Sequence, residues 1–76
     1  MVYAYVMVKT AAGESESLRD ELAAVDGVGE AHIVAGNWDL IIEVEGGEMG
    51  DVLHAVVGTI QGYEGVEDTK TYISLS

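Results

Sequence analysis

Two short segments of the sequence carry polar groups that suit a small zwitterion. Asp39 lies just after a turn expected at Gly36–Asn37, and a carboxylate there can bind an ammonium group while neighbouring backbone amides bind a carboxylate. Thr69 and Thr71 lie two residues apart, so on a strand both hydroxyls point from one face. Together these groups suit an amino-acid ligand. The alternatives are that Asp39 only caps a turn and that the threonines only reflect β-propensity.

Other candidates for chemistry are weaker. His32 and His54 are the two histidines, and they lack the H-x-x-x-H or H-x-H spacing of a metal site. Carboxylates cluster near two turns, but a chain with fourteen acidic residues is expected to contain such runs as a solvated face. The chain has no cysteine, no G-x-S-x-G elbow and no phosphate-binding glycine loop. We therefore expect no enzyme activity, no metal site and no cofactor.

The charge of the chain restricts its partners. Fourteen acidic residues stand against three basic ones, which gives a formal net charge of −11 over 76 residues. Lys9, Arg19 and Lys70 are too few and too scattered to neutralise nucleic-acid phosphates or to bind an anionic membrane surface. So much like charge favours a salt-rich, halophile-like environment, where screening is strong, over an ordinary acidic protein. With no cysteine, signal peptide or membrane span in the sequence, we expect a cytoplasmic protein.

Hydrophobic periodicity predicts four strands and two helices that position these groups. The first helix begins at Ser15 or Ser17, one of which caps it, carries Leu18, Leu22 and Val25 on one face and stops at Asp26–Gly27. The remaining elements are expected as strand Val2–Val8, strand Glu30–Ala35, a two-residue hairpin turn at Gly36–Asn37, strand Trp38–Glu45, helix Met49–Ile60 and strand Val66–Leu75. The order β-α-β-β-α-β is that of an α+β, ferredoxin-like domain spanning residues 1–76, with an antiparallel four-stranded sheet in the order 4-1-3-2.

One face of such a sheet is left without helices. The first and third strands are central and carry apolar residues on both faces, so an apolar patch is exposed whichever way the sheet turns. The exposed set from the first strand is either Tyr3, Tyr5 and Met7, or Val2, Ala4, Val6 and Val8. A small domain with such a patch is typical of a homodimer in which two sheets pack face to face in a sandwich. The alternative is a monomer that tolerates a few exposed apolar residues.

Taken together, the sequence resembles the ligand-binding (RAM) domain of Lrp/AsnC, or feast/famine, transcription regulators. The pattern is Gly-Val, a strand, Gly-x-aromatic-Asp-Leu and a closing Gly-Val-x-x-Thr-x-Thr, in that order. The matching segments are Ala4–Thr10, Val25–Glu45 and Ile60–Leu75, which cover nearly the whole chain. The resemblance implies dimers that pair through their sheets, further association into rings, commonly octamers, and amino-acid effectors bound in clefts between dimers.

The resemblance also implies which residues contact the effector. On the matching positions the effector loop consists of Gly36, Asn37, Trp38, Asp39 and Leu40. Thr69 and Thr71 are expected to line the cleft from the closing strand, with a neighbouring subunit as one possible source.

The sequence departs from the family in beginning at the first strand, without the helix-turn-helix reader of full-length regulators. We therefore expect an amino-acid-responsive effector-binding and oligomerisation module involved in transcription regulation, without its own DNA-binding domain and without direct contact to nucleic acid. Its expected partners are further copies of itself, a small amino acid and full-length Lrp/AsnC regulators. The alternative is a purely structural interaction domain that assembles with such regulators, or with an enzyme, and binds no ligand.

Overall fold

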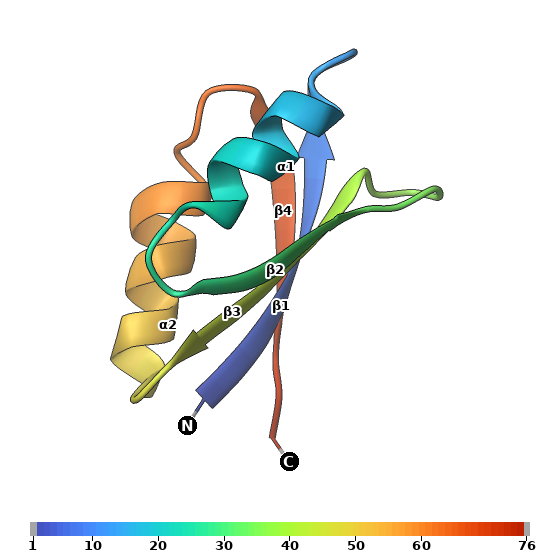
Figure 1. The fold of residues 1–76 in the computed structure, drawn as a ribbon. Coiled ribbons are helices and arrows are strands. Elements are labelled where there is room, and N and C mark those ends of the chain that lie inside the picture. The colour runs from blue at the N-terminus through green and yellow to red at the C-terminus, as the bar shows by residue number, and fades with distance from the viewer. Residues whose placement is uncertain (1, 76) are drawn as a thin grey trace.

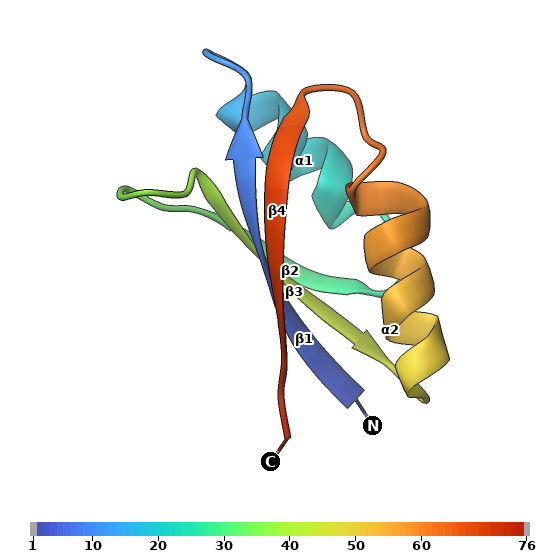
Figure 2. The same cartoon turned by 180° about the vertical axis from the view of Figure 1, so that it is seen from behind.

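A four-stranded antiparallel sheet covered on one face by helices forms the molecule (Figures 1 and 2). The computed structural model describes residues 2–75. The elements are β1 (Val2–Thr10), α1 (Ser15–Ala23), β2 (Val28–Ile33), β3 (Leu40–Gly46), α2 (Met49–Ala55), the π-helical turn η1 (Val56–Ile60) and β4 (Val66–Ile73). The strands lie in the order β2-β3-β1-β4, which confirms the predicted ferredoxin-like topology.

The core lies between the sheet and the two helices. Alternate residues of β1 and β3 point to the helices, as the strand period of two requires. The buried apolar side chains are Ala4, Val6, Val8, Leu18, Leu22, Leu40, Ile42, Val44, Val52, Ala55, Val56 and Ile60. Burying a side chain of the size of leucine or isoleucine contributes about 1.5–3 kcal/mol. This one layer of apolar contacts holds β1 and β3 in place, and with them the segments at their ends.

The opposite sheet face carries the aromatic residues of β1 and β4. Tyr5 pairs with Tyr72 and Met7 pairs with Ile41, so these four side chains lie on the face that no helix covers. Tyr5 is 41% exposed and Tyr72 is 50% exposed, with Tyr3 beside them. Of the two sets that the sequence allowed for this open face, the structure therefore selects Tyr3, Tyr5 and Met7.

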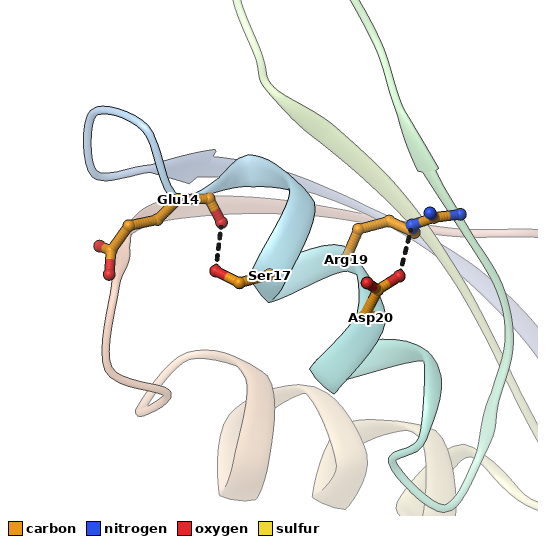
Figure 3. Close-up of polar contacts among 4 residues, drawn as sticks. All are labelled: Glu14, Ser17, Arg19 and Asp20. Atoms are coloured by element: carbon orange, nitrogen blue, oxygen red, sulfur yellow. Dashed lines mark hydrogen bonds and ion pairs between the residues drawn. The ribbon is translucent and has the colours of Figure 1, made fainter.

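The first helix begins differently from the prediction (Figure 3). Its N-cap residue is Glu14, and neither serine caps it: the Ser17 hydroxyl donates to the carbonyl of Glu14 at 3.2 Å. Ser15 is the first helical residue, and its hydroxyl lies 2.9 Å from that of Thr10. The helix ends at Ala23, so the partly buried Val25 packs on the core from the following turn.

The second helix changes its hydrogen-bond period halfway along. The expected single helix Met49–Ile60 is observed as α2 followed by η1, and the amide of Gln61 donates to the carbonyl of Val56 at 2.9 Å, a span of five residues. η1 consists of valine, glycine, threonine and isoleucine, which are all weaker helix formers than alanine or leucine, and this is consistent with the wider turn. No helix among residues 2–75 is long and apolar enough to cross a membrane.

The connection between β2 and β3 is longer than predicted. A two-residue turn of type I′ requires positive φ at both Gly36 and Asn37, but within residues 2–75 only glycines adopt positive φ. Gly36 has φ of +150°, and the connection spans residues 34–39. The strand ends move accordingly. β1 ends at Thr10 rather than Val8, and β4 ends at Ile73 rather than Leu75. β2 spans Val28–Ile33 rather than Glu30–Ala35, and β3 spans Leu40–Gly46 rather than Trp38–Glu45.

Candidate functional site

The β2–β3 loop, residues 34–39, extends from the sheet on the side of the molecule away from α2 (Figures 1 and 2). Backbone hydrogen bonds close its base. The Val34 amide donates to the carbonyl of Asp39 at 2.9 Å, and the Asp39 amide donates to the carbonyl of Val8 at 3.0 Å. The loop is therefore an extension of the hairpin that is anchored on the end of β1.

Asp39 uses one carboxylate oxygen to hold this anchor. Its Oδ2 accepts hydrogen bonds from the amide of Thr10 at 2.9 Å and from the Thr10 hydroxyl at 3.3 Å. Its Oδ1 has no hydrogen-bond donor among residues 2–75. The turn-capping role is thus present on one oxygen, while the other, on a half-buried side chain, is open to a cation.

A second contact ties the loop to the opposite face of β1. The Lys9 ammonium donates to the carbonyl of Asn37 at 2.8 Å. Lys9 and Thr10 are adjacent on a strand, so they reach the loop from its two sides. The amides of residues 35–38 have no acceptor within residues 2–75. Four consecutive free N–H groups in an exposed loop are suitable donors to an anion.

Trp38 and Leu40 flank Asp39 but differ in accessibility. Leu40 is fully buried in the core, so only its backbone is available at the site. Trp38 was expected on the third strand, on the same face as Leu40, but it lies in the loop, is half-buried and is not packed against the core. Its indole ring is therefore available for a molecule placed next to the loop.

The two threonines lie on the other side of β1. Thr69 pairs with Val8 and Thr71 with Val6, so both project from the helix-covered face near the sheet edge, and both are half-buried. Neither hydroxyl has a hydrogen-bond partner among residues 2–75. Thr69 contributes to an open cleft of about 310 Å³ together with Gln61, Val66, Glu67 and Asp68.

One copy of the chain does not bring the loop and the threonines into one pocket. Leu40 and Thr69 both pair with Val8, from β3 and from β4, so their backbones are separated by the width of β1. Two strand spacings amount to about 10 Å. The predicted site residues therefore form two half-sites at the same end of the sheet.

Lys9, Thr10 and Ser15 support the loop but were not among the predicted site residues. Among residues 2–75, Thr10 is the polar residue that is buried, with 7% of its surface exposed. A threonine at the end of a strand has no distinctive sequence pattern, and its partner Asp39 lies 29 residues away. Only the pairing of β1 with β3 brings the two together.

Two other clefts lie away from the loop. One, of about 460 Å³, includes Asp26, Glu45, Asp51 and His54 between the α1–β2 turn and α2. The other includes Glu14, Glu21 and Tyr63. No group of three histidine and acidic residues within residues 2–75 is arranged to hold a metal ion.

The molecule is thus a small α+β domain of the ferredoxin-like type, with one sheet face that no helix covers and a Gly-Asn-Trp-Asp segment in the loop between β2 and β3. The chain belongs to the Lrp/AsnC ligand binding domain family, whose model matches residues 3–76. Its sequence is 34% identical, over 55 residues, to an uncharacterized HTH-type transcriptional regulator of Pyrococcus abyssi. That match covers 72% of this chain and 37% of the regulator, so the chain spans about half the length of this curated relative.

Solved structures show the same fold. The hypothetical protein PHS023 from Pyrococcus horikoshii is 32% identical with a TM-score of 0.92, and the match covers 100% of this chain and 92% of that one. The transcriptional regulator NMB0573 from Neisseria meningitidis, solved as a complex with L-Met, has a TM-score of 0.84 at 18% identity, with 99% of this chain and 50% of that one covered. The latter likeness shows the fold alone.

Proposed function

We propose that residues 1–76 form an amino-acid-responsive effector-binding and oligomerisation module that acts in transcription regulation. The observation that carries this proposal is the composition of the β2–β3 loop. It presents a free carboxylate oxygen on Asp39 and four free amides at residues 35–38, which are complementary to an ammonium group and a carboxylate. Membership of a ligand-binding family whose curated relatives are named transcriptional regulators supports this role.

The ligand groups are assigned by charge. The ammonium group binds Oδ1 of Asp39, and the α-carboxylate binds amides of the loop. The exposed part of Trp38 contacts the ligand side chain. Thr69 and Thr71 complete the site from a neighbouring copy, because within one chain β1 separates them from the loop.

The open sheet face supplies the first contact between copies. Tyr3, Tyr5 and Tyr72 are 37%, 41% and 50% exposed on that face. Lys9 and Lys70, two of the three basic residues, lie on the same face, together with Glu43 and Glu45 of β3, which pair with Tyr5 and Tyr3. Two sheets packed face to face at about 10 Å bury these rings and form a dimer. Dimers then associate further, with a ring of eight chains as the expected size.

Ligand binding between dimers acts by population shift. A ligand that binds one assembly better than another changes their ratio by its differential affinity, and about 1–3 kcal/mol suffices for a regulatory response. Full-length regulators of the same family are a further partner, because co-assembly with them conveys the effect to DNA.

The surface charge adds a condition. With Arg19 on α1 and both lysines on the open face, no basic patch exists among residues 2–75 that would bind nucleic acid or an anionic membrane. We infer that the module works in a cytoplasm rich in salt, where its carboxylates are screened.

Sedimentation velocity in the presence of each standard amino acid tests the proposal. At least one amino acid is expected to change the distribution of assemblies. Asp39→Asn keeps the shape of the loop but removes its charge, so this variant is expected to lose the response, whereas Asp26→Asn, at an exposed turn remote from the loop, retains it. Assemblies that ignore every amino acid would support the purely structural interaction domain instead.

A further inference from the structure

The hydroxyl of Thr10 occupies the centre of a hydrogen-bonded chain that ends at Asp39. It lies 3.3 Å from Oδ2 of Asp39 and 2.9 Å from the hydroxyl of Ser15, the first residue of α1. A hydroxyl has a single hydrogen, and a carboxylate can only accept. When Thr10 donates to Asp39, the Ser15 hydroxyl must therefore donate to Thr10, so the chain runs in one direction from α1 to the loop.

We propose that Thr10 is a positioning residue for the ammonium-binding carboxylate, and that through Ser15 it couples the β2–β3 loop to the start of α1. This inference rests on the proposed function. The Thr10 amide and hydroxyl both hold Oδ2, and two donors on one oxygen fix the rotation of the carboxylate. The free Oδ1 is then held in one orientation before any ligand arrives.

Burial makes this arrangement effective. Thr10 is 7% exposed, so water does not compete freely for its hydroxyl, and hydrogen bonds in a chain polarise one another. Lys9, by contrast, holds the loop through an exposed contact to the carbonyl of Asn37. The two residues therefore have separate tasks: Lys9 restrains the backbone of the loop, and Thr10 orients its charged group.

Affinity measurements with a matched pair of ligands test the positioning role. The pair is an amino acid that binds the wild-type chain and the 2-hydroxy acid with the same side chain, which lacks the ammonium group. Thr10→Val removes the hydroxyl and is expected to reduce the preference for the amino acid about tenfold, the size of one hydrogen bond to a charged group. Thr10→Ser restores the preference, and Thr59→Val, a half-buried threonine on η1, leaves it unchanged. An equal loss of affinity for both ligands in Thr10→Val would overturn the positioning role.

Hydrogen exchange gives a second readout that needs no ligand. In Thr10→Val the amides of Val34 and Asp39, which close the base of the loop, are expected to exchange about tenfold faster, while core amides such as that of Val6 keep their rates. Unchanged loop exchange would refute the inference whether or not the chain binds an amino acid. If the wild-type chain binds no amino acid but its loop responds to Thr10→Val, the proposed function fails and the link from Thr10 to the loop stands.

Discussion

Raising the salt concentration is expected to stabilise this domain strongly. The chain carries a net charge of −11 in a body whose radius of gyration is 11.3 Å. Its carboxylates are hardly paired: within residues 2–75 the ion pairs are Arg19 with Asp20 at 3.1 Å and His32 with Glu30 at 3.8 Å, both exposed, and the second exists only when His32 is protonated. Exposed pairs of this kind contribute little, so the repulsion among the carboxylates is almost uncompensated.

The magnitude follows from a uniformly charged sphere of this size. Its self-repulsion is about 7 kcal/mol at about 0.1 M salt and about 3 kcal/mol at about 1 M. The self-repulsion of the expanded unfolded chain is about 2 kcal/mol at about 0.1 M salt and about 0.5 kcal/mol at about 1 M. The free energy of unfolding is therefore expected to rise by about 3 kcal/mol between the two concentrations. For a domain of this length that is an increase of about 10–20 °C in Tm.

Thermal unfolding followed by circular dichroism in KCl measures this increase. The variant Glu16→Gln, Glu64→Gln, Glu67→Gln removes three exposed charges, from −11 to −8, and because the repulsion varies with the square of the charge the salt increment is expected to fall to roughly half. Replacing the same three residues by aspartate keeps the charge and should keep the full increment. Equal increments in the glutamine and aspartate variants would show that charge repulsion is not the cause.

Two further predictions concern local contacts. Gly65 has φ of +96°, and a Cβ there would lie 3.0 Å from Cδ1 of Leu18. Gly65→Ala is therefore expected to lower the free energy of unfolding, measured in urea, by about 1–3 kcal/mol. Gly13→Ala, at φ of +79° with nothing within 4 Å, should cost less, and equal losses would argue against the packing contribution. The hydrogen bond from the Tyr63 hydroxyl to Glu21, together with desolvation and the charge of Glu21, raises the pKa of Tyr63 above 10.0. The contribution of this bond to stability is thus complete below pH 10.0 and is lost as the pH rises through the raised pKa. Ultraviolet titration should show Tyr63 ionising at a higher pH in the wild-type chain than in Glu21→Gln. Identical titration curves would contradict the assignment.

The strand order was predictable because the apolar residues of β1 and β3 identify them as the central strands. Val6 and Ile42 point to the helices while Tyr5 points away, a two-sided pattern that a central strand shows and an edge strand does not. Local residue types were sufficient for this conclusion. They were also sufficient to place Asp39 next to a turn.

The shape of the β2–β3 loop was not predictable from the same local information. Gly36 and Asn37 favour a two-residue turn on their own, but the amide of Asp39 is held by the carbonyl of Val8 on another strand. Likewise, the tie between Thr10 and Asp39 exists only after β1 and β3 have paired. Contacts between residues distant in the sequence therefore determine the conformation of the loop and the orientation of the Asp39 carboxylate.

The first and last described residues lie at the same end of the sheet (Figure 1), where the Ser74 amide donates to the carbonyl of Tyr3 at 2.8 Å. The β2–β3 loop is anchored at the other end of β1, about 25 Å away at the rise of a strand. Within one copy, a dye attached near Tyr3 or Ser74 is therefore separated from the loop by the length of β1. Ligand binding at the loop changes the distance between dyes at these positions on different copies only if the copies change their arrangement. Energy transfer between such dyes therefore reports assembly directly.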